Sequence, residues 1–81
     1  MKKIYKFSAT WCGPCKLLSR NLSSIESPIE IEEVDIEANP ELTQQFKVRG
    51  VPTLVLIEDD VELKRKVGVI SGEEFLNWIK L

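Results

Sequence analysis

Cys12 and Cys15 are the residues of this sequence whose type and spacing could carry chemistry. Gly13 and Pro14 separate them, and the 81-residue chain has no other cysteine. Thiol–disulfide exchange needs one thiolate that can reach the sulfur of another molecule. It also needs a second thiol close enough to resolve the mixed disulfide that forms. The pair supplies both, which points to redox chemistry at these two sulfurs.

A short strand and a helix are predicted to position the pair. Residues 4–7 are rich in β-formers, and Pro14 fits the first turn of a helix, where its missing N–H is not needed. We expect Cys12 at the start of this helix, where free N–H groups and the helix dipole favour a thiolate. The helix should end at Pro28, and its apolar face is formed by Cys15, Leu18, Leu22 and Ile25.

Three other uses of the cysteine pair are less favoured. A zinc site takes four ligands, and a chain with two cysteines and no histidine could give half of one, completed by a second chain. A cluster shared between two subunits has the same requirement. An inert structural disulfide is the third use, and it is rare in a reducing compartment.

The rest of the chain predicts three more strands and two more helices. A strand is expected at residues 29–36, where the apolar positions change phase so that both faces become apolar toward its end. A helix should begin with Asn39 as N-cap and Pro40 at its first position, and stop at Gly50. A buried strand at 54–57 should then form a hairpin with a more polar edge strand at 61–67.

The hairpin turn and the last helix complete the predicted order. Asp59-Asp60 should make the tight turn, and Ser71 with Glu74 should form a capping box at the start of the last helix. The order is βαβαββα, with a parallel crossover first and a hairpin plus helix last. The prediction is an α/β fold with a central four-stranded mixed sheet and three helices, in a single domain over residues 1–81.

Composition and charge exclude several classes of function. The net charge of −2 gives no general attraction to nucleic acid or to an anionic membrane. No apolar run approaches the roughly 18 residues of a membrane span. The basic N-terminus is not followed by the apolar segment of a signal peptide. We therefore predict a cytoplasmic monomer that binds neither nucleic acid nor membrane.

The charges are unevenly distributed along the chain. Residues 1–20 carry lysine and arginine but no acid, and residues 26–41 carry acids but no base. Our interpretation is two solvated faces of opposite sign, and the alternative is a surface that steers a charged partner.

The motifs together resemble the thioredoxin family. The matching segments keep the family's order and spacing over nearly the whole chain, and they are residues 11–16 (Trp-Cys-Gly-Pro-Cys-Lys), 39–40 (Asn-Pro), 48–53 (Val-Arg-Gly-Val-Pro-Thr) and 67–68 (Val-Gly). The family usually has an extra N-terminal strand and helix, so the resemblance implies the minimal thioredoxin fold of small, phage-type or glutaredoxin-like members.

The resemblance implies a role for each matching residue. Cys12 would be the attacking thiol and Cys15 the resolving thiol, with no cofactor besides their own disulfide. Pro52 would follow a cis bond, and the backbone of Val51 would pair with an extended substrate segment. A flat apolar rim around Cys12 would be formed by Trp11, Gly13, Pro14, Ile36, Val51, Gly68 and Val69.

Two positions depart from the family pattern. The family usually has a buried Asp six residues before the first cysteine and often a Lys six residues before the Asn of Asn-Pro, where this chain has Lys6 and Glu33. We hypothesise that a charged Lys6 near Cys15 stabilises the reduced form, giving a potential less reducing than the ~−270 mV typical of thioredoxin. Glu33 would be the only carboxylate placed to accept the proton of Cys15. The alternative is that Lys6 reaches solvent and Glu33 is a surface charge.

The resemblance implies reduction of disulfide-containing protein substrates, with thioredoxin reductase as the electron source. One alternative is a glutaredoxin-like reductase driven by glutathione, although Gly13-Pro14 differs from the Pro-Tyr usual there. Another is a binding subunit whose thiols are incidental, in which case Cys12→Ser and Cys15→Ser would leave its activity intact.

Overall fold

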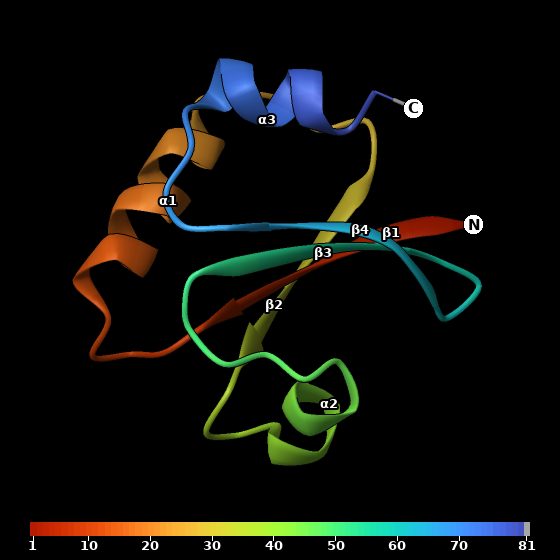
Figure 1. Ribbon diagram of the computed structural model, residues 1–81. Coiled ribbons are helices and arrows are strands. Elements are labelled where there is room, and N and C mark those ends of the chain that lie inside the picture. The colour runs from red at the N-terminus through yellow and green to blue at the C-terminus, as the bar shows by residue number, and fades with distance from the viewer. Residues whose placement is uncertain (81) are drawn as a thin grey trace.

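The computed structural model describes residues 1–80, so the last residue of the predicted domain 1–81 lies outside the described residues. Among those residues, no helix is long and apolar enough to cross a bilayer. The element order is the predicted βαβαββα (Figure 1). The elements are β1 (Lys2–Ser8), α1 (Gly13–Ser23), β2 (Glu30–Asp35), α2 (Pro40–Gln45), β3 (Thr53–Glu58), β4 (Val61–Val67) and α3 (Gly72–Trp78).

The four strands form one mixed sheet in the order β2-β1-β3-β4. β1 and β2 are parallel, as the crossover through α1 requires, and β3 is antiparallel to both β1 and β4. The hairpin turns at Asp59 and Asp60, which both have positive φ, at 51° and 69°. Two such residues match the right-handed twist of the paired strands. The predicted sheet, tight turn and β4 edge strand are confirmed.

Helices cover both faces of the sheet, with α1 and α3 on one face and α2 on the other (Figure 1). Side chains alternate along β1, so Ile4 packs in the core under α1 and α3 while Phe7 packs in the core over α2. Ile31 and Val34 of β2 divide between the same two cores, which confirms the predicted change of phase, although only Val34 is fully buried.

Helix α1 ends earlier than predicted, at Ser23 and not at Pro28. The hydroxyl of Ser23 donates to the Arg20 carbonyl, and the hydroxyl of Ser24 donates to the Asn21 carbonyl. These short-range bonds satisfy carbonyls of the last turn, so the helix can stop. Ile25 still packs against the core, but from beyond the helix end.

Helix α2 begins as predicted, with Asn39 as N-cap and Pro40 at its first position, but it ends earlier than predicted. Asn39 occupies the N-cap position, but its side chain does not cap the helix; its amide instead donates to the Asp35 carbonyl at 3.2 Å. The helix stops at Gln45, well before Gly50, because Lys47 adopts a left-handed conformation with φ of 54°. The N–H groups of residues 47 and 48 then bond back to the carbonyls of residues 44 and 43, which is a Schellman ending without glycine.

Helix α3 begins with the predicted capping box. The Ser71 hydroxyl accepts from the N–H of Glu74, whose carboxylate accepts from the N–H of Ser71. The next residue, Gly72, lies so close to α1 that an added Cβ would come within 3.1 Å of the Asn21 carbonyl oxygen. The Asn21 side-chain amide also donates to the Ile70 carbonyl at 3.0 Å. The start of α3 therefore packs closely against the last turns of α1, and we call this contact the α1–α3 junction.

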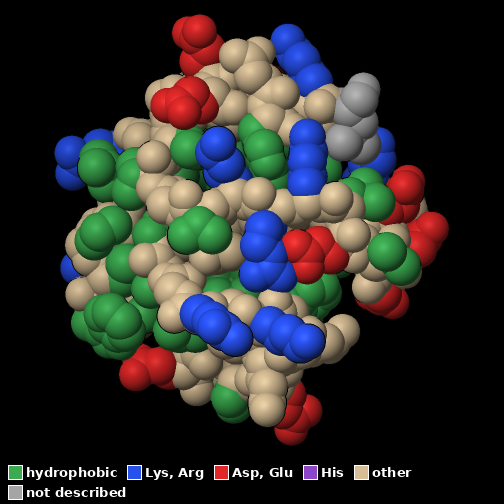
Figure 2. Space-filling view, viewed as in Figure 1, with side chains coloured by type: hydrophobic (Ala, Val, Ile, Leu, Met, Phe, Trp, Pro, Cys, Tyr) green, Lys and Arg blue, Asp and Glu red, His purple; other side chains and the backbone are tan. Residues whose placement is uncertain are grey.

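The predicted separation of charge into two faces of opposite sign is wrong. The parallel pairing of β1 with β2 brings the basic segment against the acidic one, and Lys3 pairs with Glu32 at 2.8 Å. Lys6 lies opposite Glu33 in the same register. Figure 2 shows basic side chains over the middle of one face of the molecule, with an acidic group among them and others toward its edge. Sheet formation thus neutralises the asymmetry that the linear sequence shows.

Candidate active site

Cys12 is the N-cap of α1. Its Sγ accepts a hydrogen bond from the Cys15 N–H at 3.1 Å, and its own N–H donates to the Ala9 carbonyl. Pro14 occupies the first turn of α1, as predicted. Proline has no backbone N–H, and the first-turn N–H groups of a helix have no partner within the helix, so none is lost there. A negative charge on Cys12 would therefore face an N–H donor and the positive end of the helix dipole.

Cys15 lies one turn inside α1 and forms a disulfide with Cys12, with Cα atoms 5.3 Å apart. Both cysteines are buried, at 4% and 3% exposed, so exposure alone does not distinguish their roles. Their positions do differ, because Cys15 lines a cavity of about 290 Å³ on the side of the disulfide toward β2. Other residues that line this cavity are Ser8, Ala9, Thr10, Lys16, Ser19, Glu33 and Asp35.

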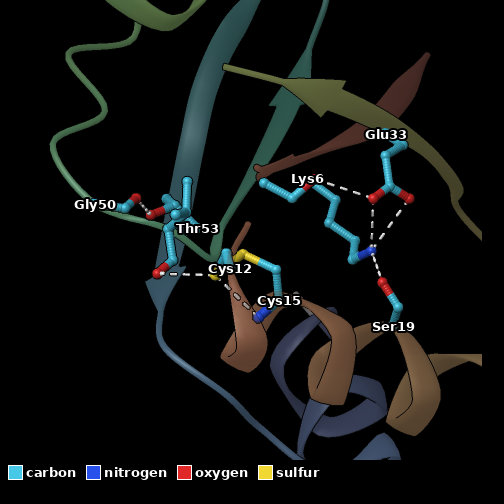
Figure 3. The surroundings of a disulfide bond; sticks show 9 residues. Lys6, Cys12, Cys15, Ser19, Glu33, Gly50 and Thr53 are labelled. Atoms are coloured by element: carbon cyan, nitrogen blue, oxygen red, sulfur yellow. Dashed lines mark hydrogen bonds and ion pairs between the residues drawn. A yellow bond between two sulfur atoms is a disulfide. The ribbon is translucent and has the colours of Figure 1, made fainter. Parts of the chain in front are cut away.

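The loop before β3 lies against Cys12. The Val51–Pro52 bond is cis, as the resemblance implies, and the Val51 carbonyl oxygen is 3.9 Å from Cys12 Sγ. Pro52 is buried, and its carbonyl accepts from the N–H of Gly68. The Thr53 hydroxyl donates to the Gly50 carbonyl at 2.7 Å and fixes the other side of the loop (Figure 3).

The structure brings only part of the predicted rim into contact with the cysteines. Ile36 and Val51 pack against the cluster of Ala9, Cys12 and Cys15. Trp11 is 66% exposed and Val69 is 38% exposed, which leaves apolar surface free near the site. Gly13 has open space where a side chain would be.

Lys6 and Glu33 form an ion pair behind the disulfide (Figure 3). Lys6 Nζ is 3.1 Å and 3.2 Å from the two Glu33 carboxylate oxygens, and it also donates to the Ser19 hydroxyl. The alternative in which Lys6 reaches solvent is wrong, because the residue is 3% exposed. Glu33 is not the only carboxylate near Cys15, because Asp35 lines the same cavity.

Sequence reasoning missed three hydroxyl groups of the site. Ser19 binds Lys6, Ser8 donates to Glu33 at 3.0 Å, and Thr53 holds the loop beside Cys12. Ser19 follows Cys15 by four residues, so helical spacing alone places it on the face of α1 that carries Cys15. Within residues 1–80, no group of three or more His, Cys, Asp or Glu side chains could hold a metal ion.

Comparison with known proteins identifies the family. The thioredoxin family model matches residues 2–81. The chain belongs to the thioredoxin family. It is 38% identical over 76 residues to a thioredoxin of Chlamydia trachomatis and 44% identical over 76 residues to one of Chlamydia muridarum; each match covers 90% of this chain and 74% of the relative.

The fold comparison agrees. A mutant thioredoxin from Halobacterium salinarum superimposes with a TM-score of 0.88 at 30% identity, covering 98% of this chain and 72% of that one. Thioredoxin-2 of the malaria parasite also gives a TM-score of 0.88, at 26% identity, over 99% of this chain and 82% of that one. The predicted thioredoxin fold is confirmed, and the chain is a thioredoxin-type thiol–disulfide oxidoreductase with a Cys12–Cys15 disulfide.

Proposed function

We propose that this thioredoxin reduces disulfides of other proteins, with Cys12 as the attacking thiol and Cys15 as the resolving thiol. The observation that carries the assignment is the position of Cys12 at the N-cap of α1, where its sulfur accepts the Cys15 N–H. An amide donor and the helix dipole both favour the thiolate, which is the nucleophile in exchange.

Each step of the proposed reaction conserves electrons and protons. The Cys12 thiolate attacks one sulfur of the substrate disulfide, forms a mixed disulfide and releases the other substrate sulfur as a thiolate. Cys15 then passes its proton to the released substrate thiolate or to solvent and attacks Cys12 Sγ, which breaks the mixed disulfide and releases the second substrate sulfur as a thiolate that takes up a proton from solvent. The substrate gains two electrons, and the pair returns to the disulfide seen in the structure.

The surface around Cys12 supports binding of an extended polypeptide. The Val51 carbonyl next to Cys12 Sγ is available to accept a backbone N–H, and the cis bond of Pro52 lies beside it. The exposed Trp11 ring and the half-exposed Val69 offer apolar contact around the sulfur. We propose that Trp11, Gly13, Pro14, Val51 and Pro52 contact the substrate.

The experiment separates the two thiols and the two electron sources. With insulin as substrate, Cys15→Ser should accumulate a mixed disulfide, and Cys12→Ser, the matched control, should form none. NADPH with thioredoxin reductase should sustain insulin reduction, whereas glutathione with its reductase should not. Turnover by glutathione alone would favour the glutaredoxin-like alternative, and absence of turnover with both would favour the binding subunit. The cytoplasmic, monomeric state stays a prediction.

A further inference from the structure

Lys6 has no part in the proposed exchange, yet its burial is unusual. Among residues 1–80 it is the one charged side chain that is buried. Buried ammonium groups are costly unless they are paired and hydrogen-bonded. Here the Glu33 carboxylate and the Ser19 hydroxyl meet this requirement. The sequence therefore maintains a cation inside the protein, on the face of β1 that α1 covers.

The two charges of the pair differ in their access to water. The Lys6 side chain is 4% exposed and the Glu33 side chain is 62% exposed. Water screens an exposed charge far more than a buried one. The field of Lys6 inside the protein is therefore only partly cancelled by Glu33, and a net positive potential remains on the inner side of the pair.

The inner side of the pair faces the redox cysteines (Figure 3). Ser19, which binds Lys6, is one helical turn after Cys15, and side chains at that spacing are neighbours. Cys15, Ser19 and Glu33 also line the same cavity. The buried cation is therefore one hydrogen bond beyond Ser19, a neighbour of Cys15 on α1, and Cys12 follows Cys15 across the disulfide.

We propose that Lys6 and Glu33 are positioning residues that set the dithiol–disulfide equilibrium of Cys12 and Cys15 in opposite directions. Reduction adds two electrons and two protons to the neutral disulfide, and release of one proton leaves a thiolate. Lys6 attracts that thiolate and so favours the reduced form. Glu33 repels it and favours the disulfide. The inference rests on the proposed exchange at the two cysteines.

The test measures the equilibrium of the disulfide with glutathione for each variant, by alkylation and mass spectrometry. Lys6→Met should shift the equilibrium about tenfold toward the disulfide, because removing a buried unit charge near the dithiol has an effect of that order. A tenfold shift equals roughly 30 mV in the potential of the pair. Glu33→Gln should shift it two- to fivefold the other way, the smaller effect reflecting its exposure. The double variant should lie between the two.

A matched control uses the neighbouring ion pair on the same strands. Lys3 bonds Glu32 at 2.8 Å, but both side chains are solvent-accessible, at 33% and 45% exposed. Lys3→Met removes the same charge from the same strand and should leave the equilibrium unchanged. Lys6→Met fills the same space with an apolar chain, and Glu33→Gln is at the surface, so at least one variant of the pair should fold as wild type does.

The pH dependence distinguishes a charge effect from a packing effect. The difference between wild type and Lys6→Met should be largest at alkaline pH, where the reduced form carries a thiolate, and should shrink as the pH falls and the thiols become protonated. The other charged groups that line the cavity, Lys16 on α1 and Asp35 on β2, are the same in every variant.

Three results would overturn the inference: equal potentials in wild type and Lys6→Met, shifts of the same sign for Lys6→Met and Glu33→Gln, or a Lys6→Met shift that persists at low pH. None of them bears on whether insulin is reduced. Loss of insulin reduction with these opposite shifts intact would instead count against the proposed function alone.

Discussion

Replacing Gly72 by alanine tests whether the α1–α3 junction is packed as tightly as the structure shows. The added Cβ would lie 2.8 Å from Ile25 Cγ2 and 3.1 Å from the Asn21 carbonyl oxygen. The isoleucine side chain can rotate, but the carbonyl is part of the helix backbone and also accepts from the Ser24 hydroxyl. The junction can therefore relieve the first contact but not the second without moving α1 or α3.

Two effects of opposite sign decide the magnitude. Overpacking a well-filled contact costs about 1–3 kcal/mol. Replacing a glycine whose backbone suits alanine stabilises by about 0.4–1 kcal/mol, because the unfolded chain has fewer conformations. We expect Gly72→Ala to lower the free energy of unfolding by about 1 kcal/mol. With a urea m-value of about 1 kcal/mol per M for so small a domain, the midpoint should fall by about 1 M.

Urea unfolding followed by circular dichroism measures the shift, and Gly50→Ala is the matched control. No atom lies within 4 Å of a Cβ added at Gly50, and its φ is not in the left-handed region. This control should keep or slightly raise the midpoint. A midpoint for Gly72→Ala at or above that of wild type would refute the close approach of the two helices.

Two further predictions concern polar contacts of the sheet. Thr53→Val keeps the shape of the side chain but removes the hydroxyl that donates to the Gly50 carbonyl, so it should cost about 1 kcal/mol in urea unfolding; an unchanged midpoint would contradict this. The hydrogen bond from Arg65 holds the pKa of Glu62 below its ordinary value, so its contribution to stability is present above the unfolded pKa and lost as the pH falls through the folded one. Glu62→Gln should therefore lower stability at pH 7 by less than about 1 kcal/mol, and the difference from wild type should shrink as the pH falls below the ordinary pKa of a glutamate.

The sequence predicts the element order well because each signal is local. Each signal is carried by residues only a few positions apart. Examples are the spacing of apolar residues, Pro14 in the first turn of α1, and the capping box of Ser71 and Glu74. The helix ends are predicted less well. Lys47 in a left-handed conformation ends α2, and lysine carries no signal for that conformation.

The charged segments show what a linear reading cannot provide. Residues 1–20 and 26–41 differ in sign along the chain, which favoured two separate charged faces. Pairing of β1 with β2 places one segment against the other, as the Lys3–Glu32 contact shows. Strand neighbours and register are tertiary information, so the charge pattern acquires its meaning only in the folded sheet.

The cysteine pair and the Lys6–Glu33 pair differ in how far the sequence alone predicts them. Cys12 and Cys15 meet because they are three residues apart on one helix start. Lys6 and Glu33 meet because the parallel register of β1 and β2 places them opposite each other.

One signal for Lys6 was nevertheless present in the sequence. Alternation along β1 places Lys6 on the same side as Ile4, while Phe7 lies on the other side, and the structure buries all three. A lysine at an inward position of a strand covered on both faces cannot remain unpaired. The sequence therefore required an anion inside or at the edge of the sheet, and the structure identifies it as Glu33 on the strand next to β1. The presence of an ion pair at Lys6 was therefore predictable in principle. The different exposure of its two side chains to water could be found only from the three-dimensional structure.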